Sequence, residues 1–418
     1  MQYKWKRQTA IFLSSQAISL FGSVLVQFSL TAYVAMQTKS GLTATLAILC
    51  AVLPTFLLSP FAGVWADKYD RKLLTMLADG GIALCTLIMI IFFSTGKRSI
   101  SIILVALAIR ALGAAVQTPA VSALLPDIVP EEQLTRINGI NGTLQSIFTL
   151  VSPVLGAFLL GFASLEAIFL IDVITAVIAI VILAFAFKLP HKEVPEQKEA
   201  SANYFSEMRA GLKYIGKNKF LIELFAFFTV FYILMATPAF LPQIQVARNY
   251  GEGYWHLSVM DVAFSAGMII GGIAISIWQG LKNKVHMIIV AHVIMGISIA
   301  LRGLEVPFVW YCVLTALCGL AMPFVGTPVM TLLQEKVDPT YIGRVFGVMT
   351  MINTSMMPLG MAMFGPLADV VSVELLMLGT GIACILLSIA MIKAKALVRA
   401  GDSNKPEKII ATTSNIRE

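Results

Sequence analysis

Charged residues are scarce in this 418-residue chain: only 13% are Asp, Glu, Lys or Arg, whereas 58% are hydrophobic. Because soluble globular proteins carry about 25% charged residues, this composition excludes a water-soluble globule. There are only four histidines, and they form no H-E-x-x-H motif. No G-x-x-x-x-G-K-[ST] phosphate-binding loop is present either. These absences argue against an intramembrane enzyme and against a transporter driven by ATP.

Cysteine is also scarce, and its spacing matches no metal-binding motif. All the cysteines fall in apolar segments or at their edges: Cys50, Cys85, Cys312, Cys318 and Cys384. We interpret them as small core residues. We therefore expect no bound metal and no other cofactor.

Hydrophobic runs, in contrast, fill almost the whole chain. Each has about 18–28 residues, enough to cross a hydrocarbon core of about 30 Å as a helix. We predict an all-α integral membrane protein with about 12 transmembrane helices. The predicted spans are 9–35, 42–66, 73–95, 99–125, 137–161, 166–187, 218–245, 257–280, 286–303, 306–333, 343–368 and 373–396.

The two halves of the chain repeat each other at an offset of about 208 residues, read directly from the aligned sequence. Residues 122–139, before the fifth span, align without a gap with residues 330–347, before the eleventh. The coinciding pairs are Leu124/Leu332, Leu125/Leu333, Val129/Val337, Arg136/Arg344 and Gly139/Gly347. Two parallel six-helix halves are typical of a secondary transporter, whose substrate path lies between them.

The repeat predicts four segments. They are a six-helix bundle over 1–187, a cytoplasmic linker over 188–217, a second six-helix bundle over 218–396 and a cytoplasmic tail over 397–418. Phe205, Met208, Leu212 and Ile215 have helical spacing, which predicts a short helix in the linker, lying at the membrane surface.

The basic residues set the predicted orientation. The loops assigned to the outside hold only Lys39, Lys97, Arg98, Arg248 and Arg302. Most of the 30 basic residues thus share a side with both termini, which the positive-inside rule makes cytoplasmic. The net charge of +7 reflects this topology and not a nucleic-acid partner. We expect a monomer in a bacterial plasma membrane, with lipid and a small-molecule substrate as its partners.

Charges inside spans are candidate functional groups, because each is costly to hold in lipid. Arg110 lies about 11 residues into its span, roughly 17 Å deep, where a fixed positive charge can tune a carboxylate or bind an anion. Asp172 is the candidate proton carrier; the alternative is an acid that stabilises a helix N-terminus. Asp261 is comparable, and Glu223 lies near the start of span seven. We group these four as candidate proton-coupling residues.

The loop between spans two and three is rich in charge. An acid there can cap the following helix, and the basic residues can bind carboxylates on the inner side. We interpret it as a conformational latch that forms in one state and breaks in another. The predicted latch residues are Gly63, Asp67, Asp70, Arg71, Lys72 and, further along span three, Asp79.

Polar side chains also form stripes on single helical faces. Spacings of three and four residues occur in spans one and five. Because amides that face lipid are costly, these faces should line the cavity between the halves or hold a neighbouring helix. Bulky apolar residues could add an adaptable wall. The predicted cavity residues are Gln16, Ser19, Ser23, Gln27, Phe28, Asn138, Asn141, Gln145, Phe228, Tyr232, Met235 and Phe324.

Several of these segments resemble motifs of the major facilitator superfamily. Residues 63–72 are similar to its motif A, with Asp67 and Arg71 at the positions of the signature acid and base of that motif. Residues 110–115 resemble motif B, whose arginine is associated with proton coupling. Ser152-Pro-Val-Leu-Gly156 is similar to the antiporter motif of span five.

Within that superfamily, the chain is most similar to bacterial drug:proton antiporters of the macrolide-efflux type. The carrying segments run in order through most of the chain and include Gln16–Leu20, Asp70–Lys72, Thr118–Ala120, Leu124–Leu134, Leu144–Ile147, Val151–Pro153, Ile171–Val173, Phe264–Met268, Gln334–Lys336 and Gly343–Phe346. The resemblance implies export of macrolide-like or other lipophilic compounds, driven by a proton gradient.

Two other classes of function are alternatives to drug export. A transporter of the same fold could carry lysophospholipid, siderophore or metal ion, although a metal carrier would need His, Asp or Asn in facing spans. The only clearly embedded imidazole, His292, has no evident partner. A membrane enzyme or a sensor is the remaining class, and no nucleophile–base set supports it. Sodium is the alternative to protons as the driving ion.

Overall fold

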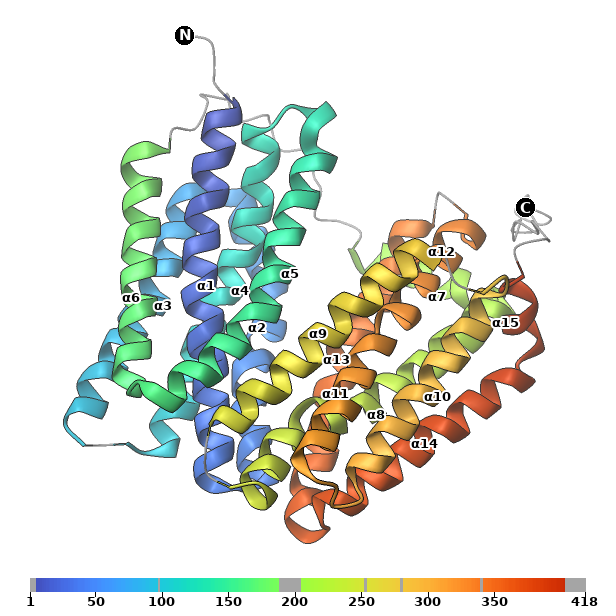
Figure 1. Ribbon diagram of the computed structural model, residues 1–418. Coiled ribbons are helices and arrows are strands. Elements are labelled where there is room, and N and C mark those ends of the chain that lie inside the picture. The colour runs from blue at the N-terminus through green and yellow to red at the C-terminus, as the bar shows by residue number, and fades with distance from the viewer. Residues whose placement is uncertain are drawn as a thin grey trace. The chain divides into compact units, whose positions relative to one another are not determined.

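The computed structural model describes residues 5–96, 98–187, 204–251, 254–278, 281–338 and 341–402 (Figure 1). Within these ranges the regular secondary structure is helical, and no β-strand is formed. Twelve spans are long and apolar enough to cross a membrane. This confirms the predicted fold class, and the chain is a multi-pass membrane protein.

The first six spans begin and end within a few residues of their predicted limits. Side chains set several starts: Ser40, Asp70 and Ser164 each accept a hydrogen bond from a backbone N–H in the first turn of the helix that follows. The elements are α1 (Trp5–Thr38), α2 (Gly41–Lys68), α3 (Arg71–Ser94), α4 (Ile100–Ile128), α5 (Glu131–Phe162), α6 (Leu165–Val181) and the π-helix η1 (Ile182–Ala186).

The second half adds nine helices over its described residues. These are α7 (Tyr204–Lys217), α8 (Lys219–Asn249), α9 (Trp255–Trp278), α10 (Lys284–Arg302), α11 (Phe308–Ala321), α12 (Pro323–Lys336), α13 (Ile342–Val370), α14 (Val373–Lys393) and α15 (Lys395–Ala400). The single span predicted over 306–333 consists of α11 and α12, because Pro323 cannot donate a backbone hydrogen bond and starts a new helix.

The predicted linker and tail are described only in part. Residues 188–203 and 403–418 lie outside the described residues. The linker helix is confirmed as α7, which packs on α13 through Tyr214 and Tyr341, whose stacked rings lie 4.4 Å apart. Its placement at the membrane surface stays a prediction. The first residues of the predicted tail belong to α15.

The chain forms two compact units. The first contains α1 to η1 together with the segment Val246–Asp261, and the second contains α7, the rest of α8 and α9, and α10 to α15. We call α1–α6 the first bundle and α8–α14 the second bundle. Within the first bundle, α1 packs on α5 and α6, and α3 packs on α4 and α6 (Figure 1).

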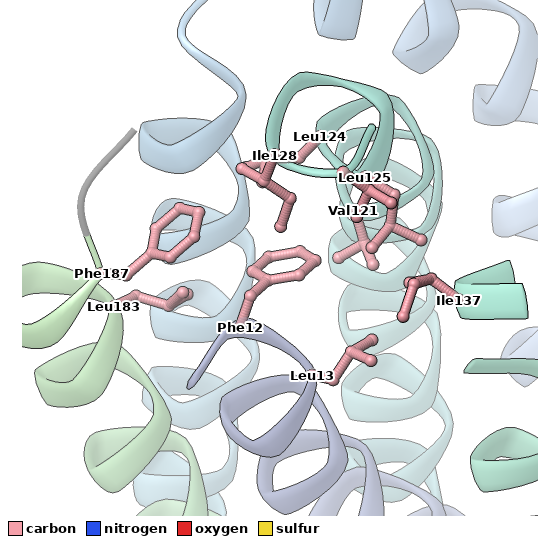
Figure 2. Close-up of a cluster of buried hydrophobic side chains, with 10 residues drawn as sticks. Phe12, Leu13, Val121, Leu124, Leu125, Ile128, Ile137, Leu183 and Phe187 are labelled. Atoms are coloured by element: carbon pink, nitrogen blue, oxygen red, sulfur yellow. The ribbon is translucent and has the colours of Figure 1, made fainter. Parts of the chain in front are cut away.

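An apolar cluster closes one end of the first bundle (Figure 2). Phe12 of α1 is completely buried, and its ring lies 5.4 Å from that of Phe187, just after η1. Figure 2 shows Val121 and Leu125 of α4 on the side of the Phe12 ring away from Phe187, with Leu124 and Ile128 above the ring. This cluster fixes the ends of α1, α4 and α6 and leaves the polar residues of these helices further inside the bundle.

Candidate functional site

A buried ion pair lies inside the first bundle. Arg110 of α4 is 6% exposed, Asp172 of α6 is fully buried, and Arg110 Nη1 contacts Asp172 Oδ2. The same nitrogen contacts the hydroxyl oxygen of Thr86 on α3. Because an isolated charge is costly in a membrane interior, contact between opposite charges is the arrangement that allows both to be buried. Arg110 and Asp172, two of the candidate proton-coupling residues, are therefore partners.

Neighbouring groups complete the hydrogen bonding of this pair. Asp172 Oδ1 accepts a hydrogen bond from Ser23 Oγ at 3.2 Å, and Asp172 Oδ2 accepts one from Thr86 Oγ1 at 2.7 Å. Arg110 Nη2 donates to the backbone carbonyl of Ser23 at 3.2 Å. Four helices, α1, α3, α4 and α6, thus meet at one site, and both carboxylate oxygens of Asp172 have donors.

Gly22 allows α1 to approach α6 at this point. A Cβ atom on Gly22 would overlap Thr175 Oγ1 and would lie 3.0 Å from Asp172 Cα. Small residues at helix crossings let membrane helices pack backbone against backbone. The absence of a side chain at Gly22 therefore positions the next residue, Ser23, to reach the ion pair.

Asp79 of α3 forms a second acidic centre in the same bundle. It is 1% exposed, and its Oδ1 atom accepts hydrogen bonds from Ser19 Oγ at 2.7 Å and from Gln117 Nε2 at 2.5 Å. This corrects the sequence assignment of Asp79 to the latch. The physical reason is distance, because Asp79 is two helical turns beyond Arg71, or about 12 Å at 1.5 Å per residue.

The remaining latch residues lie where α2, α3 and α4 come together. Arg71 Nη1 contacts Asp127 Oδ2 at 2.6 Å and the Ala123 carbonyl at 2.9 Å, and Arg71 Nε donates to the Ala66 carbonyl at 2.9 Å. Asp127, near the end of α4, is the acid that the sequence analysis missed.

The other predicted latch residues have separate roles. Asp70 caps α3, and Lys72 Nζ donates to the Phe187 carbonyl at 2.9 Å. A Cβ atom on Gly63 would meet no described atom within 4 Å, so no close helix contact is made at this latch residue among the described residues. The side chain of Asp67 lies outside the described residues.

The second bundle contains a matching ion pair at the ends of its helices. Lys284, the first residue of α10, contacts Glu335 near the end of α12. Glu335 aligns with Asp127 in the repeat that the sequence shows. The acid of each pair could therefore have been found from the repeat, whereas its basic partner lies on a separate helix and gives no aligned signal.

Two neighbouring cavities lie along α1 in the first bundle, one between α1, α4 and α5 and the other between α1 and α5. The smaller, about 110 Å³, is lined by amides of Gln16, Gln117, Asn141 and Gln145 among other residues. The larger, about 490 Å³, shares Leu13, Ala17 and Leu144 with it and extends past Arg136 and Lys6. Together they form one groove with polar and apolar walls, which we call the α1–α5 groove.

Several predicted cavity residues lie elsewhere. Ser19 and Ser23 bond to the buried carboxylates inside the bundle, and Gln27 and Asn138 are exposed without lining either cavity of the groove. Phe28 packs near Gly156 of α5. The polar stripe of α1 therefore does not face one cavity: Ser19 and Ser23 face the bundle interior, whereas Gln27 is exposed.

Apart from Phe28, the apolar residues predicted as a cavity wall belong to the second unit. Phe228 is buried against Phe231, with ring centroids 5.8 Å apart, and Tyr232 lies 5.9 Å from Phe228. Met235 is also buried, and the Phe324 ring is 6.3 Å from that of Trp278. Phe228 and Met235 are therefore core residues in this structure.

Two of the predicted proton-coupling residues lie apart from the ion pair. Glu223 Oε2 accepts a hydrogen bond of 2.9 Å from the backbone N–H of Leu397, so it caps the start of α15. Asp261, near the start of α9, is half-buried, and its Oδ2 atom has no hydrogen-bond partner in the described part of the chain.

The family profile of the Major Facilitator Superfamily matches residues 10–361. The chain belongs to this superfamily. It is 33% identical to macrolide efflux protein A of Streptococcus pyogenes over 393 residues, which cover 93% of this chain and 96% of that protein. A protein of the same description from Enterococcus faecalis is 32% identical over 75% of this chain and 97% of its own length.

Solved structures show the same fold for this superfamily member. A POT family peptide transporter superposes with a TM-score of 0.69 at 11% sequence identity, covering 96% of this chain and 99% of that one. At this identity the likeness concerns the fold alone. The residues of the ion pair, the Asp79 centre and the groove must therefore be interpreted from their own geometry.

Proposed function

We propose that the protein exports amphipathic small molecules, macrolide antibiotics among them, from a bacterial cell in exchange for protons. The observation that carries the proposal is the 33% identity to macrolide efflux protein A over almost the whole chain. The excess of basic residues on the side that carries both termini supports a cytoplasmic location for them. The cargo crosses the plasma membrane without chemical change.

The Arg110–Asp172 pair supports coupling to an ion gradient. A buried ion pair adds little stability compared with apolar packing, so its presence in a membrane-spanning bundle calls for a functional reason. The pair joins four helices of the first bundle. A change in charge or contact at this point therefore alters the packing of α1, α3, α4 and α6 together.

The α1–α5 groove supports an amphipathic cargo. Its larger cavity of about 490 Å³ falls in the range of about 300–1,000 Å³ that is usual for small-molecule sites. Leu13, Ala17 and Leu144 supply apolar contact, and the amides of Gln16, Asn141 and Gln145 supply hydrogen bonds that fix orientation. We propose that one end of the cargo binds here.

Transport in liposomes tests the proposal. The purified protein is reconstituted with labelled erythromycin and an imposed pH gradient, with and without a protonophore. We expect movement of the label that depends on the gradient and is abolished by the protonophore. Asp172→Asn should lose this activity, because it leaves Arg110 without its counter-charge.

Glu166→Gln is the matched control. Glu166 is also a carboxylate of α6, but it lies at the exposed end of the helix and bonds Arg98 at 2.7 Å. This variant should transport normally. If folded wild-type protein binds erythromycin but moves none under any gradient, the export proposal fails. If a sodium gradient alone drives the movement, proton coupling fails.

A further inference from the structure

Asp79 is a buried carboxylate whose charge has no cationic partner in the described part of the chain. Its Oδ1 atom has two neutral donors, Ser19 and Gln117, whereas its Oδ2 atom is buried without a hydrogen-bond partner among the described residues. Asp172 differs in its partners, since it contacts the Arg110 cation and has donors on both oxygens. The first bundle thus holds one compensated and one uncompensated acid.

The charged groups around Asp79 do not compensate it. From α6, the Asp172 carboxylate acts on Asp79 with a charge of the same sign. From α4, Arg110 is the buried cation, and it is already in contact with Asp172. From α1, Gln16 and Ser19 are the polar residues beside it, and both are neutral.

The other charged groups of these helices lie near helix ends, with Lys6 and Arg7 exposed at the start of α1. Arg71 contacts Asp127 at one end, and Arg98 contacts Glu166 at the other. Lys72 binds backbone carbonyls beyond η1. An ionised Asp79 is therefore a negative charge held in the membrane interior beside another negative charge, and a proton on Oδ2 would remove that charge.

A polar route connects Asp79 to the α1–α5 groove. Gln117, which bonds Asp79, lines the smaller cavity together with Gln16. Gln16 is 7% exposed, and its side chain lies beside the Asp79 carboxylate, close enough to act on it as a neutral donor. Gln16 and Gln117 thus separate the Asp79 carboxylate, with its Oδ2 atom without a partner in the described residues, from the groove.

We propose that Asp79 is the group that takes up and releases the transported proton, while the Arg110–Asp172 pair stays ionised. This inference rests on the proposed function, because a proton carrier has meaning only in a proton-coupled transporter. On uptake, a water-borne proton bonds to Asp79 Oδ2 and the carboxylate becomes a neutral acid. On release, the same O–H bond breaks and the proton returns to water.

Proton uptake would also change the groove. An ionised Asp79 accepts hydrogen bonds only, so Gln16 and Gln117 turn their N–H groups toward it. A protonated Asp79 donates from Oδ2, which favours the amide oxygen of Gln16 and turns its N–H₂ group toward the groove. The groove would then offer a donor where it had offered an acceptor, and cargo affinity would follow the protonation state.

Infrared spectroscopy of the purified full-length protein tests the assignment without transport. With isotope-labelled aspartate, a protonated carboxylic acid gives a C=O band that is separate from that of the carboxylate. The other aspartates, Asp261 included, also give such a band, so the spectrum of Asp79→Asn is subtracted from that of the wild type. We expect a C=O band that titrates with pH to remain in this difference, and the same band to be present in Asp172→Asn. A difference spectrum without a titrating C=O band, or a band lost only in Asp172→Asn, would overturn the proposal.

Two further measurements guard against misfolded variants and separate this proposal from the proposed function. If Asp172→Asn does not fold, the difference spectrum between the wild type and Asp79→Asn decides alone, with elution volume and thermal unfolding as checks of the fold of Asp79→Asn. Transport is measured separately: Asp79→Asn should exchange labelled for unlabelled erythromycin but lose accumulation driven by the gradient. If Asp79 titrates but the protein couples no transport to protons, only the proposed function is refuted. If Asp79→Asn still accumulates erythromycin under the gradient, only the assignment of Asp79 as the proton carrier is refuted.

Discussion

Buried ionisable groups have different partners in the two bundles. In the first, Arg110 contacts Asp172, and Asp79 accepts two hydrogen bonds. In the second, Arg302 is 2% exposed, lies 5.6 Å above the Tyr311 ring, and has two guanidinium nitrogens without hydrogen-bond partners in the described chain. His292 is equally isolated, since neither ring nitrogen is bonded to a described residue.

At the helix ends, by contrast, the bundles are alike. Arg71 contacts Asp127 in the first, and Lys284 contacts Glu335 in the second, with the two acids aligned in the sequence repeat. The repeat therefore retains the ion pair at the helix ends and differs in the core. In the described residues, a buried contact between opposite charges therefore lies in the first bundle, whereas Arg302 and His292 of the second bundle are buried against aromatic rings.

Breaking the Arg110–Asp172 pair should have the largest effect. Asp172→Asn leaves the Arg110 cation buried without a counter-charge, and loss of one partner of a buried pair costs about 3–5 kcal/mol. Gradient-driven transport should also be lost. Thermal or chemical unfolding in detergent micelles measures the first effect, and the liposome assay measures the second.

A double variant makes this prediction sharper. Arg110→Met combined with Asp172→Leu removes both charges and should recover most of the stability of the single variants, as replacement of buried pairs by apolar residues does elsewhere. Transport should not recover. If the double variant were less stable than either single variant, the two residues would not act as a pair.

Filling the helix contact at Gly22 should have the next largest effect. In Gly22→Ala the new methyl group collides with Thr175 and the backbone of Asp172. Overpacking of this kind costs about 1–3 kcal/mol. Gly81→Ala in α3 is the matched control, because its Cβ meets nothing within 4 Å and alanine is favoured over glycine in helices by about 1 kcal/mol. Equal unfolding midpoints for the two variants would argue against a close α1–α6 contact.

Much of the fold could be predicted from the sequence, because bilayer thickness sets the length of an apolar span. Arg110 and Asp172 were also found, since charges within spans are rare and need a reason. The sequence also indicated that Arg110 could tune the Asp172 carboxylate. It did not give their direct contact or the other helices that meet there, because these depend on how four helices are rotated about their axes. The stripe that contains Ser19 and Ser23 gives one face of α1, but it does not say which neighbour that face contacts.

The missed residues show the same limit. Gln117 lies two turns after Arg110 on one face of α4, and this spacing was a usable signal. Asp79 was assigned to the latch because its depth in the span was read from the nearby charged loop. Thr86 carried no signal, since a threonine in a membrane helix usually bonds its own backbone, as Thr86 also does with the Ile82 carbonyl at 3.0 Å.

The end-of-helix ion pairs should respond more weakly to mutation. Arg71 and Asp127 are about 30% exposed, and exposed pairs contribute about 0–1 kcal/mol to stability. Arg71→Gln should therefore change stability little and slow transport, because Arg71 also bonds the carbonyls of Ala66 and Ala123. Lys284→Gln should slow transport less.

Charge exchange tests whether the pair itself matters. Arg71→Asp combined with Asp127→Arg should recover part of the transport rate that either single change removes. Failure to recover any rate would mean that the carbonyl contacts of Arg71, and not its pairing with Asp127, carry its role. Initial rates in liposomes, normalised to the amount of reconstituted protein, provide the measurement.

Substitution of His292 should have the smallest effect. The imidazole lies against Phe231, at 4.3 Å between ring centroids, and it makes no hydrogen bond to any described residue that a leucine would lose. Apolar replacements of similar size usually change stability by less than about 1.5 kcal/mol, and here the removal of an unbonded polar group offsets part of that cost. His292→Leu should therefore unfold near the wild-type midpoint and keep the wild-type pH dependence of transport. A loss of transport with normal stability would mean that an ionisable group of the second bundle takes part in transport. The contrast drawn between the buried ionisable groups of the two bundles would then be wrong.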